Sequence, residues 1–112
     1  MFRMEQQKRK CRAWIEGEMT IYNALSLKQQ LMPALDEKRN LEIDLSQVTE
    51  IDCSGIQLLM LAKKERARQQ KALVLTNHSS AVLDAFELLG LVSWFSDPVV
   101  MNFTNSGQLN VE

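Results

Sequence analysis

The sequence lacks any hydrophobic run that approaches the ~18 residues of a membrane-spanning helix. Residues 1–12 also lack the apolar core of a signal peptide, so we expect a cytoplasmic protein with no membrane partner. The two cysteines, Cys11 and Cys53, form neither a CxxC pair nor a disulfide framework, which fits a reducing compartment. The sequence shows no metal-ligand cluster and no phosphate-binding loop, so we expect no metal and no cofactor.

The chain also lacks an excess of charge of either sign, because its 13 Lys and Arg residues are balanced by 14 Asp and Glu residues. A formal net charge of −1 gives no reason to expect a nucleic acid as the partner. The one uneven region is segment 3–12, where five basic residues accompany Glu5 alone. Either a solvated arm or strand edge, or a docking patch, would explain this composition.

A single domain of mixed α/β layers is expected from the length of 112 residues and from the pattern of apolar residues. This pattern predicts strands at 10–15, 19–21, 41–45, 72–76 and 99–103, with a turn at 16–18 and a loop at 46–50. Helical spacing predicts helices after Asn23, at about 54–70 with its charged half at 63–70 solvated, and from Ser79 or Ser80 to Gly90. The continuous apolar strand at 72–76 is typical of the centre of a sheet, or of a strand covered on both faces. We expect the core to extend over residues 11–103 and residues 104–112 to be frayed.

The segment Asp52-Cys53-Ser54-Gly55 is the most informative part of the chain, because it joins a strand to a helix. Ser54 occupies a position suited to a helix N-cap, and Gly55 allows another surface to approach the backbone closely. A hydroxyl at the positive end of a helix dipole suits either a structural cap or phosphate chemistry. The residues alone leave both interpretations open.

At this point the sequence resembles the STAS domain, the fold of bacterial anti-sigma factor antagonists. Four segments carry the resemblance in family order, which are 16–20, 41–46, 51–55 and 86–91 followed by Trp94-Phe95. The resemblance implies a STAS fold, with a central mixed sheet and helices packed on it. It also implies a protein that binds other proteins and is not an enzyme.

The resemblance implies that Ser54 is phosphorylated, because the serine before the glycine is the residue that partner kinases modify in this family. The expected partner is a serine kinase or anti-sigma factor of the histidine-kinase-like ATPase class, with a PP2C-type phosphatase to restore binding. Cys53 stands where serine or threonine is common in the family, so Ser54 is the only hydroxyl at this point. The output is open and includes transcription or biofilm regulation. An alternative is a constitutive STAS subunit that stabilises the ATPase of a lipid-transport ABC complex.

The remaining candidate residues surround Ser54. Asp52 either forms a turn with nearby amides or also contacts the kinase, and Asp44 is expected to brace the 46–53 loop, with a direct partner contact as the minority interpretation. The helix after Ser54 is apolar nearly all round, so a docking surface is expected at Cys53, Gly55, Ile56, Gln57 and Met60. Burial of that face under neighbouring helices is the alternative. An enzyme in which Cys53 and His78 form a nucleophile–base pair is a further alternative to the switch and to the transporter subunit.

Overall fold

The computed structural model describes residues 1–91 and residue 94. Its elements in chain order are β1 (Phe2–Gln6), β2 (Lys10–Met19), α1 (Ala24–Ala34), β3 (Asn40–Ile51), α2 (Cys53–Arg68), β4 (Leu73–Thr76) and α3 (Ser80–Leu88). Strands and helices alternate after β2, so the expected mixed α/β fold is confirmed. None of the helices in this part of the chain combines the length and the apolar character needed to cross a membrane.

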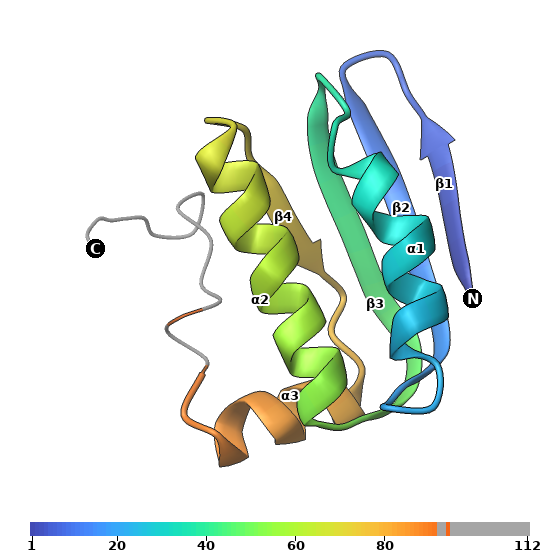
Figure 1. Ribbon diagram of the computed structural model, residues 1–112, viewed down its shortest axis with the longest axis vertical. Helices are drawn as coiled ribbons and strands as arrows, with labels where there is room; N and C mark the ends of the chain where they lie inside the picture. The colour runs from blue at the N-terminus through green and yellow to red at the C-terminus, as the bar shows by residue number, and fades with distance from the viewer. Residues whose placement is uncertain (92–93, 95–112) are drawn as a thin grey trace.

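The strands form one sheet in the order β1-β2-β3-β4 (Figure 1). β1 is antiparallel to β2, whereas β2, β3 and β4 run parallel to one another. Phe2 of β1 packs against the core, so the expected start of the core near residue 11 is wrong. Among the described strands β4 lies at an edge of the sheet, and not at its centre as one expectation had it. Val74 and Thr76 on one face of β4 are half-buried, so the alternative expectation of a strand covered on both faces is not met either.

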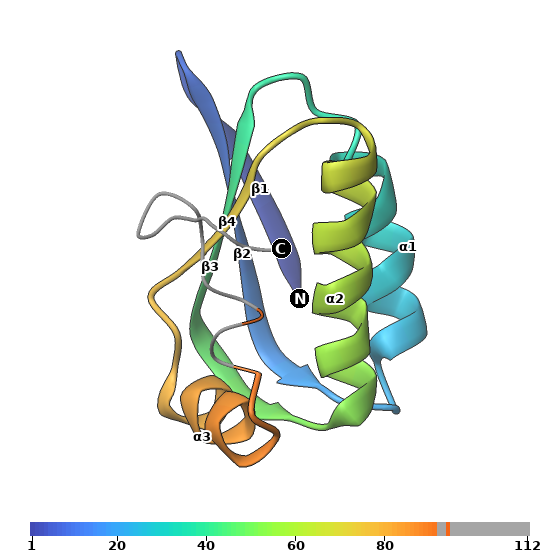
Figure 2. The same cartoon turned by 90° about the vertical axis from the view of Figure 1, so that its left-hand side faces the viewer.

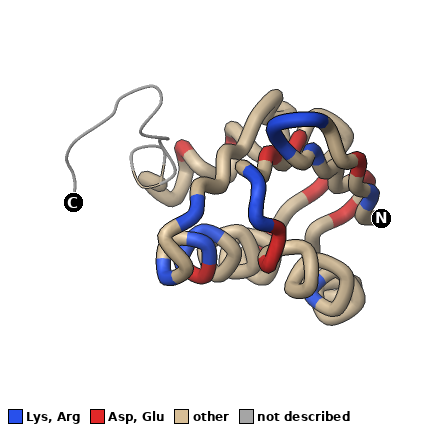
Figure 3. Tube along the Cα trace, turned by 90° about the horizontal axis from the view of Figure 1, so that it is seen from above, with Lys and Arg blue, Asp and Glu red and all other residues tan. Residues whose placement is uncertain are grey.

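The basic segment 3–12 covers most of the edge strand β1, the turn after it and the first residues of β2. Three of its five basic residues form ion pairs, which are Arg3–Glu16 at 3.1 Å, Lys10–Glu42 at 3.0 Å and Arg12–Asp44 at 2.8 Å. Figure 3, which looks down on the end of the sheet at the β1–β2 turn, shows basic and acidic segments interleaved. This arrangement supports the interpretation as a solvated strand edge.

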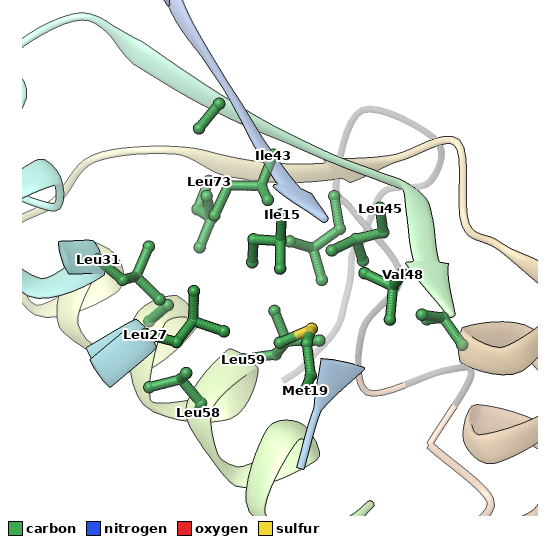
Figure 4. Packing of buried hydrophobic residues seen from close by; sticks show 14 of the residues in the cluster. Ile15, Met19, Leu27, Leu31, Ile43, Leu45, Val48, Leu58, Leu59 and Leu73 are labelled. Carbon is green, nitrogen blue, oxygen red and sulfur yellow. The ribbon is translucent and has the colours of Figure 1, made fainter. Parts of the chain in front are cut away.

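α1 and α2 cover the same face of the sheet, while α3 lies at its lower end (Figure 2). Every second residue of β2 points toward the helices, so Cys11, Ala13 and Ile15 are fully buried. Leucines of both helices meet these side chains, among them Leu27 of α1 and Leu59 of α2 (Figure 4). The core therefore fixes α1 and α2 side by side on the sheet.

Two predicted breaks are parts of strands. Residues 16–18 continue β2 instead of forming a turn, and Gly17, with a φ of +91°, lies where the pairing with β3 shifts register. A register shift of this kind is a β-bulge, in which one strand carries an extra residue relative to its neighbour. Glycine adopts a positive φ without strain. Residues 46–50 continue β3 instead of forming a loop, because Val48 is buried while its polar neighbours face solvent. β3 therefore runs on almost to the start of α2, whereas residues 20–23 separate the end of β2 from α1.

α3 begins and ends as the sequence predicts. Ser79 is its N-cap, and Ser79 Oγ accepts a hydrogen bond from the N–H of Val82 at 3.3 Å. Gly90 has a φ of +66°, and the N–H of Leu91 donates to the carbonyl of Phe86 at 2.8 Å. The strand expected at 99–103 and the tail expected at 104–112 lie outside the described residues.

Arg66 departs from the expectation that segment 63–70 is solvated on most faces, since only 1% of its surface is exposed. Its guanidinium donates hydrogen bonds to four main-chain carbonyls, those of Leu35, Glu37, Arg39 and Ala72. These carbonyls belong to the α1–β3 and α2–β4 connections. The planar fork of donors therefore joins both connections at the end of the molecule opposite the start of α2.

Candidate functional site

The start of α2 is organised by Asp52. Asp52 is the N-cap, and α2 begins at Cys53, so the predicted N-cap position of Ser54 is wrong. Asp52 Oδ1 accepts hydrogen bonds from the backbone N–H groups of Ser54 at 2.8 Å and Gly55 at 3.3 Å. A carboxylate satisfies these amides and also meets the positive end of the helix dipole. The Ser54 side chain, in the second position of the helix, is thereby released from capping.

Asp52 also holds the connection between β2 and α1. Its Oδ2 accepts a hydrogen bond from the N–H of Ile21 at 2.9 Å, and its own N–H donates to the carbonyl of Met19 at 3.2 Å. The bond from Ile21 above all, with those from Gly55 and Ser54, holds the pKa of Asp52 below its ordinary value of 3.8. The carboxylate is therefore charged at neutral pH. Its predicted bonding to nearby amides is confirmed, while its contact with a partner stays a prediction.

Ser54 is half-buried beside a shallow groove of about 290 Å³ between α1 and α2. The groove is lined by Ala24, Leu25 and Lys28 of α1 and by Ser54, Gln57, Leu58 and Leu61 of α2. Within the described part of the chain, the Ser54 hydroxyl has no hydrogen-bond partner. The hydroxyl is therefore accessible from the groove and is not needed to hold the fold.

Gly55 and Ile56 face the core, so their predicted exposure on a docking surface is wrong. Ile56 is 3% exposed. A Cβ atom on Gly55 would lie 2.2 Å from the carbonyl oxygen of Met19 and 2.8 Å from Cγ1 of Ile51. The first turn of α2 already packs against the ends of β2 and β3, and only glycine permits this approach.

The other predicted docking residues of α2 differ in exposure. Cys53 and Gln57 are exposed, and Met60 is half-buried because it packs against the core. Cys53 and Gln57 can therefore contact another protein without rearrangement. Met60 offers only part of its side chain.

Three exposed apolar residues of the β2–α1 connection and the first turn of α1 were missed by sequence reasoning, and one of them, Leu25, lines the groove. Ile21 and Leu25 are each 69% exposed, and Tyr22 is 92% exposed. The sequence did contain a signal for their exposure, because Ile21-Tyr22 precedes Asn23 and none of the three residues shares the spacing of the buried α1 residues. The strand predicted at 19–21 concealed this signal. The Ser54 rim is our name for the exposed residues around this site, which are Ile21, Tyr22, Leu25, Gln57 and Leu61.

Asp44 belongs to the sheet and not to the Ser54 rim. It is buried, and its carboxylate accepts hydrogen bonds from Arg12 Nη2, from Asn77 Nδ2 and from the N–H of Ser46, each at 2.8 Å. Burial opposes its ionisation, but the bonds from Ser46, Asn77 and Arg12 outweigh burial and lower its pKa to about 2. Asp44 thus braces β3 against β2 and the end of β4. The 46–53 loop that it was expected to brace is strand, apart from the start of α2.

The nucleophile–base interpretation gains no support. His78 stacks edge-on against Phe86 with ring centroids 5.6 Å apart, as a loop residue beside α3. Among the described residues, no group of three or more His, Cys, Asp or Glu side chains is placed to hold a metal ion. What the site presents is a serine hydroxyl beside a groove with an apolar rim.

Comparison with known proteins identifies the same family. The family described as "Mlab, STAS domain" matches residues 2–95. The anti-sigma-B factor antagonist of Bacillus subtilis (strain 168) is 30% identical over 77 residues, which cover 69% of this chain and 71% of that protein.

Two solved structures share the fold. The anti-sigma factor antagonist SpoIIAA in its unphosphorylated form matches with a TM-score of 0.68 and 20% identity over 87% of both chains. The Bacillus cell fate determinant SpoIIAA in its phosphorylated form matches with a TM-score of 0.63 and 19% identity over 87% of this chain and 90% of that chain. Because the family match covers most of the chain and the relative in Bacillus subtilis is 30% identical, this chain belongs to the STAS domain family.

Proposed function

We propose that this chain is a phosphorylation-controlled protein-interaction switch of the anti-sigma factor antagonist type. The observation that carries the proposal is the position of Ser54, whose unpartnered hydroxyl opens onto a groove beside exposed apolar residues. The relative in Bacillus subtilis is named an anti-sigma-B factor antagonist, which supports the same role. The protein acts by binding and release, without catalysis of its own, in the cytoplasm.

The Ser54 rim is the proposed docking surface. Exposed Ile21, Tyr22 and Leu25 lie together because Asp52 holds the N–H of Ile21 beside the start of α2. A cluster of large exposed apolar side chains is typical of a protein-binding site. Gln57 and Leu61 extend this surface along α2.

The proposed partner is a serine kinase or anti-sigma factor of the histidine-kinase-like ATPase class. It binds the unphosphorylated form and transfers phosphate to Ser54. The phosphate adds about −1.5 to −2 charge beside the charged Asp52, on a surface that must be desolvated in the complex. Binding is therefore lost while the fold is retained, which agrees with SpoIIAA having been solved in both forms. A PP2C-type phosphatase restores binding.

The test is a kinase assay on the purified chain. Candidate ATPase-domain proteins from the same genome are incubated with the chain and ATP, and the product is mapped by mass spectrometry. We expect one phosphoryl group at Ser54 and none on Ser54→Ala, which should bind the kinase whether or not ATP is present. Modification only at Ser79 or Ser80 would overturn the proposal.

The second candidate is a constitutive STAS subunit that stabilises the ATPase of a lipid-transport ABC complex. The observation in its favour is that the matching family is described as "Mlab, STAS domain", without reference to sigma factors. The two candidates differ in their response to phosphate. A switch should lose at least tenfold in partner affinity, ~1.4 kcal/mol, when Ser54 is phosphorylated. A constitutive subunit should bind its ATPase in the absence of any kinase or phosphatase.

A further inference from the structure

The groove beside Ser54 contains one basic side chain, Lys28, which extends from α1. Lys28 is exposed and forms no ion pair within the described part of the chain. Its flexible four-carbon stem allows the ammonium group to move across the groove. No described contact therefore commits Lys28 to another role.

A phosphate on Ser54 would find two of the backbone hydrogen-bond donors at the start of α2 already occupied. Phosphates at helix starts bind free backbone N–H groups, but Asp52 Oδ1 accepts from those of Ser54 and Gly55. Asp52 is also negatively charged and lies two residues before the phosphate. A phosphate on Ser54 is thus repelled from the cap and needs a cation elsewhere.

The charges around the groove leave Lys28 as that cation. The first turns of α1 and α2 contain no acidic residue, so nothing on either helix competes for its ammonium group there. On the strand side, Asp52 is the carboxylate that lies at the start of α2, two residues before Ser54. Repulsion from Asp52 directs a phosphate away from the strand ends, toward α1.

We infer that Lys28 is the counter-ion of phosphorylated Ser54, and that the pair bridges α1 and α2 across the groove. Phosphorylation would then close the groove as well as charge it. A phosphate oxygen and an ammonium group form a charge-assisted hydrogen bond, which is stronger than a neutral one. This inference depends on the proposed phosphorylation of Ser54 for its biological meaning.

The test places phosphoserine at position 54 by genetic code expansion, so no kinase is needed. The second pKa of the phosphate is measured by ³¹P NMR titration in the otherwise unchanged chain, in Lys28→Ala and in Lys28→Arg. A nearby cation favours the doubly charged phosphate, so we expect this pKa to be about 0.5 unit lower with Lys28 than with alanine. Lys28→Arg should retain the lower value. Lys38→Ala, which removes an exposed lysine of the α1–β3 connection, is the matched control and should change nothing.

Equal phosphate pKa values with Lys28 and with alanine would overturn the inference, provided that thermal melts show both proteins folded. An equal shift in Lys38→Ala would overturn it as well, because the effect would then come from net charge. Neither result bears on whether a kinase modifies Ser54. Conversely, a kinase assay that fails at Ser54 would refute the proposed function and leave the ³¹P measurement valid.

Discussion

Asp52 Oδ2 lies 2.9 Å from the backbone nitrogen of Ile21, 31 positions earlier in the chain, and this bond joins the β2–α1 connection to the start of α2. The same carboxylate caps α2 through Oδ1. One side chain therefore holds both the helix that carries Ser54 and the apolar residues beside it. The geometry of the docking surface depends on Asp52 even if no partner touches it.

Asp52→Ala should loosen this junction without unfolding the domain. The N–H groups of Ile21 and Ser54 lose their acceptor, so their hydrogen exchange should accelerate by about fivefold to tenfold, while exchange in β2 and β3 stays unchanged. Amide exchange followed by NMR measures this directly. Asp84→Ala, which removes an exposed aspartate of α3, is the control. Unchanged protection of the Ile21 amide in Asp52→Ala would show that other contacts hold the connection.

Gly55→Ala should destabilise the fold by about 2 kcal/mol or more, because the added methyl group overlaps the carbonyl of Met19 and forces α2 away from β2. Urea unfolding provides the measurement. Ser54→Ala is the matched control at the neighbouring position, and its free energy of unfolding should stay within about 1 kcal/mol of wild type. Equal stability of the two variants would mean that α2 can shift at little cost.

Asp44 should make the stability of the domain dependent on acid pH. Its pKa is about 2 in the folded protein against an ordinary 3.8, so the unfolded chain binds the proton more tightly. The carboxylate therefore stabilises the fold fully above about pH 4, and this contribution, about 2 kcal/mol, is lost as the pH falls to about 2. Asp44→Asn should lack it. Urea unfolding from pH 2 to 5 should show the two proteins converging at low pH, and parallel curves would contradict the assignment.

The sequence was sufficient to predict the α/β layers because their local patterns agree with their packing. Alternation at 41–45 marks the first half of β3, and helical spacing of apolar residues marks the buried face of α1. Ser79 and Gly90 delimit α3 as expected because caps act through neighbouring backbone groups. These features need no knowledge of distant residues.

The rest depends on contacts between segments far apart in the chain. Asp52 and Ser54 are both good N-caps, and the choice is made by the Ile21 amide, which only the folded β2–α1 connection brings near. Arg66 lies in a segment of charged residues, and its burial requires carbonyls from connections 27 to 31 residues earlier in the chain. The residues that are neighbours in sequence do not indicate such partners. The same limit explains why Ile56 was expected on the surface and Tyr22 was not.

Leu25→Glu should separate the docking function from the fold. Leu25 is exposed on α1 at the groove, so the free energy of unfolding should stay within about 0.5 kcal/mol of wild type. In a complex the new carboxylate would lose its water without gaining a hydrogen bond or a counter-ion. The affinity of the unphosphorylated chain for its partner protein should therefore fall at least tenfold, ~1.4 kcal/mol. Leu88→Glu places the same charge on an exposed leucine of α3, outside the groove, and should bind normally. Thermal melts and calorimetric titration with the kinase found in the phosphorylation assay measure both quantities. Normal binding by Leu25→Glu would place the docking surface away from the Ser54 rim. Equal losses of affinity in both variants would indicate a general effect of negative charge, since neither leucine supports the core.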